Sequence, residues 1–232
     1  MLADIDQSLD ALAQDPSVRV IVITGCGVTF SSGADRSELN DPATIERTTS
    51  LLSSILTRIE QSPVPVVCRV NGAAFGAGLA IVAASDISIT VTDAVFGLPE
   101  VRFGLVAGPA AAACLTRIGQ TAALDVLLTG RRFGAAEAER MHLVTALVDR
   151  VDLDATVEAR VSELLLGDYD AIACTRRLAR QLSGPAIAER LQVAAAAARG
   201  NAVVRDIVER EVAPMEMDLD QTRDEPLDAS AQ

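Results

Sequence analysis

Glu100 lies in an otherwise apolar stretch just downstream of a glycine-rich bend, and this combination predicts proton-transfer chemistry. The bend, at residues 71–84, opens a predicted helix whose first N–H groups lack partners within the helix and so are available to a ligand oxygen. A second glycine turn, at residues 30–35, directly follows an apolar strand predicted at residues 18–24. Two sources of N–H groups and one buried acid together predict a site that stabilises an oxyanion and moves a proton.

The elements that must position these residues alternate along the chain. The expected strands span residues 18–24, 64–70 and 87–91. The expected helices span residues 2–14, 45–59, 121–128, 135–141, 153–165 and 171–182, with a further helical stretch at 187–210. Buried strands that alternate with helices are typical of a parallel α/β arrangement.

Composition limits the classes of function. The chain has 232 residues, of which 50% are hydrophobic, enough for one domain with a substantial core. The formal net charge of −12 argues against nucleic acid or an anionic membrane as the partner, since binding phosphates needs clustered cations. We find no signal peptide and no apolar run of the roughly 20 residues that a membrane span needs, and expect a cytoplasmic protein.

The four cysteines predict free thiols. Cys26, Cys68, Cys114 and Cys174 are far apart and include no Cys-x-x-Cys pair. Buried free thiols in a reducing compartment explain them better than disulfides or a zinc site, and we expect no metal.

Seven segments in this order resemble the enoyl-CoA hydratase/isomerase (crotonase) family. They are VIVITG at 20–25, FSSGAD at 30–35, PVVCRVNG at 65–72, GAG at 76–78, SDI at 85–87, FGLPE at 96–100 and LTGRRF at 128–133. The resemblance implies an α/β crotonase-like fold, a spiral of ββα units with a C-terminal helical region. It implies a core over residues 1–180 and a C-terminal helical segment at 181–214. The acidic residues 215–232 are expected to be disordered.

The resemblance also implies a first β-strand and a CoA-contacting loop before the helix expected at residues 2–14. The sequence contains neither. A mis-assigned start, an expression boundary or a truncated paralogue would each account for this difference.

The family's functional residues correspond to named positions in this chain. The resemblance implies that the N–H groups of Ala34 and Ala77 form the oxyanion hole and that Glu100 is the catalytic acid and base. The residues expected to contact the substrate are Ser32, Gly33, Asp35, Gly76, Gly78, Ala80 and Gly108. The substrate is an acyl-CoA thioester, so coenzyme A arrives with the substrate and no separate cofactor is expected. The resemblance further implies a homotrimer or a dimer of trimers.

The choice of reaction depends on Ala80. Hydratases of the family hold water between two glutamates, and Ala80 stands where the first would be. One glutamate is sufficient to move a proton from C2 to C4 of a 3-enoyl-CoA, so isomerisation is favoured. A weakly active hydratase and a catalytically poor acyl-CoA-binding protein are the alternatives. Gly108 replaces the aspartate of dienoyl-CoA isomerases and aryl dehalogenases, which disfavours those two reactions.

Two other motifs are assigned no chemistry. Gly76-x-Gly78 lacks a third glycine and a following acid, so a dinucleotide-binding fingerprint is rejected. His142 has no acidic or nucleophilic partner in its motif and is not expected to be catalytic.

Overall fold

The computed structural model describes residues 1–33, 41–184 and 186–196. Its helices are α1 (Leu2–Gln14), α2 (Pro42–Gln61), α3 (Ala77–Ala84), α4 (Gly108–Thr129), α5 (Ala135–Arg140), α6 (Leu153–Leu166) and α7 (Tyr169–Leu182), with 3-10 helices η2 (Pro99–Phe103) and η3 (Arg150–Asp152). Its strands are β1 (Ile21–Thr24), β2 (Thr29–Ser31), β3 (Val66–Val70), β4 (Ala73–Phe75), β5 (Ile87–Val91), β6 (Val95–Gly97), β7 (Arg132–Gly134) and β8 (Ala146–Val148). Residues 187–196 are also helical.

The strands form two four-stranded sheets that wind as a spiral. The first sheet has the order β1-β3-β5-β8 and is parallel throughout, and the second has the order β2-β4-β6-β7. In the second sheet only the β6–β7 pair is antiparallel. Each of the first three turns places one strand in each sheet and then a helix, in the order β1-β2-α2, β3-β4-α3 and β5-β6-α4. This is the predicted α/β spiral of ββα units.

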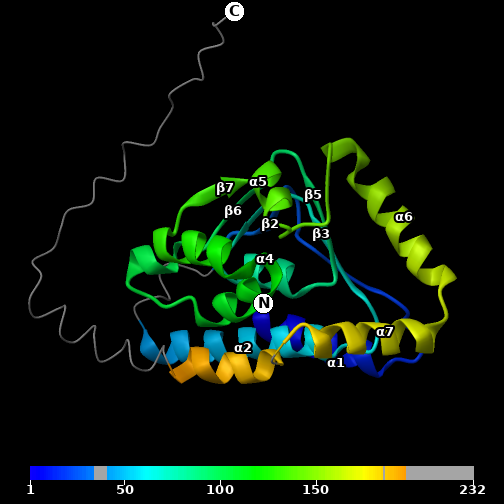
Figure 1. The fold of residues 1–232 in the computed structure, drawn as a ribbon, viewed down its shortest axis with the longest axis horizontal. Helices are drawn as coiled ribbons and strands as arrows, with labels where there is room; N and C mark the ends of the chain where they lie inside the picture. The colour runs from blue at the N-terminus through cyan, green and yellow to red at the C-terminus, as the bar shows by residue number, and fades with distance from the viewer. Residues whose placement is uncertain (34–40, 185, 197–232) are drawn as a thin grey trace, which may run out of the picture.

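Helix α2 supplies one wall of the core. Asp41 caps its N-terminus by accepting hydrogen bonds from the N–H groups of Ala43 and Thr44, and Pro42 occupies the first turn, where its missing N–H is not needed. Further along, an apolar stripe at helical spacing packs into the core. Its buried members are Leu52, Ile55, Leu56 and Ile59. In Figure 1, α1, α2 and α7 form a layer below the sheets.

Two arginines of α7 connect this helix to the core. Arg176 donates to the carbonyls of Glu60 at 2.9 Å and of Ser62 at 2.6 Å, at the C-terminal end of α2. Its Nε also forms an ion pair with Asp86 at 2.7 Å, and Arg180 donates to the other Asp86 oxygen at 2.9 Å. The arginines thus satisfy carbonyls at the end of α2 that have no partner within the helix.

The sequence predicted the long elements more successfully than the short ones. The strands at β1, β3 and β5 and the helices at α1, α2, α5, α6 and α7 were predicted within a few residues. Strands β2, β4, β6, β7 and β8 were not predicted, because each has three residues, too few for an alternating apolar pattern. The helix predicted at 121–128 is the last part of α4, which begins at Gly108.

Helix α4 is the one described helix that is long and apolar enough to cross a membrane. The sequence prediction, which found no such run, missed it. Gly119 has φ 73° and ψ 166°, so a kink divides the helix. The first part packs against α3 and buries Ala110, Ala112, Ala113 and Cys114. The first part of α4 therefore belongs to the core, whereas Leu124 and Leu128 of the second part are exposed.

All four cysteines are free thiols. Cys68 and Cys114 are buried, as predicted, but Cys26 and Cys174 are exposed, so the prediction of burial was wrong for these two. Burial raises the pKa of both the Cys68 and Cys114 thiols to about 12. Both buried thiols are therefore protonated at neutral pH and poorly nucleophilic.

Candidate active site

Asn71 joins the first two turns of the spiral. Its side-chain oxygen accepts from the N–H of Gly25 at 3.0 Å, and its amide nitrogen donates to the carbonyl of Gly27 at 2.8 Å. A Cβ on Gly72 would lie 1.9 Å from the carbonyl oxygen of Val28, so only glycine permits this close approach. The Asn71-Gly72 pair therefore fixes the segment that leads into β2 and the first glycine turn.

The two predicted glycine turns come together. A Cβ on Gly78 would lie 2.4 Å from the Cβ of Ser31, which places the first turn of α3 directly against the end of β2. A Cβ on Gly76 would lie 3.8 Å from the Cα of Gly33. Gly33 itself has φ +90° and donates its N–H to the Ser31 hydroxyl at 3.3 Å. Segments more than forty residues apart thus form one site.

Ala77 begins helix α3 at this meeting point. Gly76 precedes it with φ 53° and ψ −117°, a conformation that suits glycine, and donates its own N–H to the Gly97 carbonyl at 3.1 Å. The N–H of Ala77 has no carbonyl one helical turn earlier to bond. It lies at the end of the helix where the dipole is positive, which favours a negatively charged oxygen.

The carboxylate of Glu100 lies next to the backbone of Gly76. Pro99 starts the short helix η2 that carries Glu100, and Gly104 ends it in the left-handed conformation at φ 66°. A Cβ on Gly76 would lie 2.9 Å from Oε1 of Glu100, so the carboxylate approaches the backbone of the second turn. Oε2 of Glu100 is buried and has no hydrogen-bond partner among the described residues. Burial raises the pKa of Glu100, which suits a group that takes up and releases a proton.

A cavity of about 110 Å³ adjoins these groups. Ala77 and Glu100 contribute to its wall, together with one face of α2 and the segment leading into α4. The other lining residues are Thr44, Ile45, Thr48, Thr49, Leu52, Leu105, Val106, Ala107, Pro109 and Ala110. Glu100 is the only ionisable side chain among these lining residues. An apolar pocket with one buried acid can hold an acyl chain and exchange a proton with it.

Other predicted site residues lie in different surroundings. Ala80 is completely buried and Gly108 is buried, and neither lines the cavity. A Cβ on Gly108 would meet Ala194 at 3.2 Å, so the helical residues 187–196 pack against the start of α4. Ser32 is exposed. Ala34 and Asp35 lie outside the described residues, as do residues 197–232, so the predicted acidic tail does too.

The threonines of α2 are the cavity residues that the sequence reasoning missed. Thr44, Thr48 and Thr49 continue the apolar stripe of α2 toward its N-terminus, at the same helical spacing. The available signal was this change from aliphatic to hydroxyl-bearing residues along one face of a helix. It indicates that this end of the stripe faces something other than the core.

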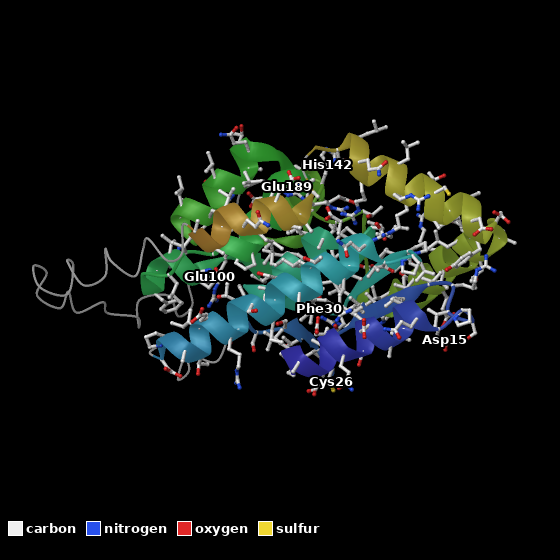
Figure 2. The ribbon with its side chains drawn as sticks, turned by 90° about the horizontal axis from the view of Figure 1, so that it is seen from below. Asp15, Cys26, Phe30, Glu100, His142 and Glu189 are labelled. Atoms are coloured by element: carbon white, nitrogen blue, oxygen red, sulfur yellow. The ribbon has the colours of Figure 1, made fainter. Side chains whose placement is uncertain are left out.

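His142 lies apart from the site. Figure 2 labels it and Glu100 on well-separated parts of the molecule. Its φ of 61° is the only positive value at a residue other than glycine in the described part of the chain. His142 therefore occupies a turn rather than the pocket around Glu100.

Comparison with known proteins assigns the family. The model of the enoyl-CoA hydratase/isomerase family matches residues 1–199. A putative enoyl-CoA hydratase of Thermus thermophilus is 32% identical over 211 residues, covering 86% of this chain and 80% of its own. A probable enoyl-CoA hydratase of Mycobacterium tuberculosis is 32% identical over 182 residues, covering 78% of this chain and 69% of its own. The chain belongs to the enoyl-CoA hydratase/isomerase family, as its motifs predicted.

Solved structures agree with this assignment. An enoyl-CoA hydratase from Mycobacterium avium subsp. paratuberculosis matches with a TM-score of 0.79 and 30% identity, covering 90% of this chain and 85% of its own. An enoyl-CoA hydratase/carnithine racemase from Magnetospirillum magneticum matches with a TM-score of 0.75 and 26% identity. The match covers 80% of this chain and 72% of the Magnetospirillum chain. The fold is therefore the crotonase fold.

Proposed function

We propose that this protein is an enoyl-CoA isomerase that moves the double bond of a 3-enoyl-CoA to the 2-position. The observation that carries the proposal is the Glu100 carboxylate beside Gly76 and Ala77, on the wall of an apolar cavity. Its Oε2 has no hydrogen-bond partner among the described residues, and no second acid is among the described residues that line the cavity. A single base is sufficient for this reaction, whereas activation of water by two carboxylates needs a second acid.

In the proposed mechanism, Glu100 and the backbone N–H groups have separate roles. The thioester oxygen accepts hydrogen bonds from Ala77 N–H and, by the family resemblance, from Ala34 N–H. The ionised Glu100 removes a proton from C2, and the electron pair of that C–H bond delocalises onto the thioester oxygen as a dienolate. The protonated Glu100 then returns the proton to C4, and the double bond forms between C2 and C3. Fixed N–H donors favour this step because charge develops on the oxygen they face.

Hydration is the second candidate, because the relatives named above are called hydratases. In this chain Ala80 occupies the place of the family's first water-binding glutamate, and it is completely buried in the core. An alanine can neither hold a water molecule nor exchange a proton with it. We therefore rank hydration below isomerisation, and catalytically poor acyl-CoA binding below both.

Steady-state kinetics with two substrates separates these candidates. Isomerisation of 3-hexenoyl-CoA is followed by formation of the 2-enoyl product, and hydration of 2-butenoyl-CoA by loss of its conjugated double bond. We expect a higher kcat/KM for isomerisation. A higher kcat/KM for hydration would assign the protein as a hydratase, and binding of both thioesters without turnover would favour the acyl-CoA-binding alternative.

We also propose that the protein assembles as a homotrimer or a dimer of trimers. Large apolar side chains exposed along α6 and α7 support this proposal, because burial between subunits would remove their apolar surface from water. They include Leu165, Leu166, Leu178 and Leu182. Light scattering at micromolar concentration should give the mass of three or six chains, and a monomeric mass would contradict the proposal.

A further inference from the structure

Two threonine hydroxyls on the cavity wall are not used by the protein itself. Thr48 and Thr49 line the cavity, and among the described residues neither side-chain hydroxyl has a hydrogen-bond partner. Both side chains are half-buried. A hydroxyl that leaves bulk water without a partner loses stabilisation, so this pair of groups is suited to a polar ligand atom inside the cavity.

Most other hydroxyls of α2 have partners within the protein, and the exception, Ser50, is exposed to solvent. Ser53 donates to the carbonyl of Thr49 at 2.8 Å, and Thr57 donates to the carbonyl of Ser53 at 2.9 Å. Ser54 donates to Asp6 at 2.6 Å, and the Thr44 hydroxyl bonds the capping residue Asp41. The protein satisfies the hydroxyls that face its own structure, whereas those of Thr48 and Thr49 remain available.

The size of the cavity limits how much of the acyl chain it can enclose. At about 110 Å³ it is smaller than the cavity of roughly 150 Å³ that holds benzene, so it accommodates about four or five carbon-sized groups. With the thioester carbonyl held at Ala77, those groups are the chain from C2 onward. The end of a short acyl chain therefore lies within the same small space as the α2 threonines, whereas a longer chain would extend beyond the open cavity.

The described part of the cavity wall offers no cation to an anionic chain end. Glu100 is the one ionisable lining residue, and no arginine is among the described residues that form the wall. A carboxylate on the acyl chain would meet the negative charge of Glu100 without a compensating cation. A neutral oxygen, as a hydroxyl or keto group, has no such penalty and can bond a threonine hydroxyl.

We propose that Thr48 and Thr49 form a polar wall that selects short acyl-CoA thioesters carrying a neutral oxygen group toward the end of the chain. This inference rests on the proposed function of the cavity as an acyl-CoA site and adds the class of acyl group that it prefers. Thr48 and Thr49 determine specificity and take no part in the proton transfer.

Binding of a matched pair of thioesters tests the inference independently of turnover. Hexanoyl-CoA and 5-hydroxypentanoyl-CoA have acyl chains of nearly the same size, because a terminal methyl is replaced by a hydroxyl. Dissociation constants are measured by calorimetry for the wild type and for the Thr48→Val/Thr49→Val variant. We expect the wild type to bind the hydroxylated thioester at least as tightly as hexanoyl-CoA. In the variant the ratio should shift by about fivefold toward hexanoyl-CoA, the effect of one lost hydrogen bond.

Two controls complete the experiment. Thr57→Val removes a hydroxyl from the same helix but outside the cavity wall, and should leave the ratio unchanged. Glutaryl-CoA, which has a terminal carboxylate, should bind the wild type more weakly than either neutral thioester. Equal ratios in wild type and variant, or tightest binding of glutaryl-CoA, would overturn the inference while leaving the acyl-CoA site intact. Failure of all three thioesters to bind would contradict the proposed function as well.

Discussion

The backbone of Gly76 and the carboxylate of Glu100 are so close that a Cβ on residue 76 would lie 2.9 Å from Oε1 of Glu100. This relationship places the proposed base beside the turn that opens α3 and presents the N–H of Ala77. It also explains why residue 76 must lack a side chain. The proposed base and one proposed oxyanion donor are therefore held by a single contact between the second and third turns of the spiral.

Gly76→Ala should damage both the fold and the site. The positive φ of 53° strains any L side chain, and the added methyl group collides with Glu100. Strain of this kind typically costs about 1–3 kcal/mol of stability. We expect a lower Tm and a large loss of isomerisation in the same variant. Gly134→Ala is the matched control, because residue 134 has φ −88° and open space around its Cβ position. A Gly76→Ala variant with wild-type Tm and rate would refute the close contact.

The pH dependence of kcat/KM should show the raised pKa of Glu100. As a base, Glu100 must be ionised in the free enzyme, so activity falls as pH falls through its pKa. Burial raises that pKa, so the acidic limb should have its midpoint above the ordinary glutamate value of about 4.3. A midpoint at or below the ordinary value would show that burial does not raise the pKa of Glu100.

Stability should also depend on the ionisation of Glu100. Because burial raises the pKa of Glu100 in the folded protein, the folded state binds its proton more tightly than the unfolded state. Ionisation therefore destabilises the fold as pH rises from the unfolded pKa through the folded one. Glu100→Gln should consequently have a higher Tm than the wild type at pH 7, with a smaller difference near pH 4. Thermal melts at the two pH values measure this, and a Tm difference that grows toward pH 4 would contradict the account.

Arg176→Ala should destabilise the fold without touching the cavity. It removes the ion pair with Asp86 and leaves the carbonyls at the end of α2 without their donor. Arg180 still pairs with Asp86 in this variant, so we expect a loss of about 1–3 kcal/mol in the free energy of unfolding, from the carbonyls left without a donor. Arg160→Ala breaks an exposed ion pair with Glu163 and should change the free energy of unfolding by less than about 1 kcal/mol. Denaturant titrations of both variants make the comparison, and equal losses would contradict the assigned role of Arg176.

The sequence was informative where chemistry constrains residue type over a short segment. Glycine turns and an isolated acid among apolar residues leave a clear local pattern, and this pattern identifies Gly33, Gly76 and Glu100. Their convergence could be expected only through the family resemblance. The contacts that produce it, such as Gly78 against Ser31, join residues far apart in the chain.

The cavity wall could not be predicted in the same way. Thr48 and Thr49 look like ordinary polar positions of a helix until the segment from Leu105 to Ala110 is placed opposite them. The burial of Ala80 away from the cavity likewise depends on how α3 packs against α2 and α4. These properties arise from tertiary packing and leave no pattern in the local sequence.

The most direct test of the single-base account is the rate of 3-hexenoyl-CoA isomerisation by Glu100→Gln. Glutamine keeps the shape of the side chain but cannot carry the proton, so kcat should fall by about 100- to 10,000-fold. The dissociation constant for hexanoyl-CoA should change little. Glu46→Gln, an exposed acid at the start of α2, is the control and should retain full activity. An isomerisation rate in Glu100→Gln equal to that of the wild type would contradict the account.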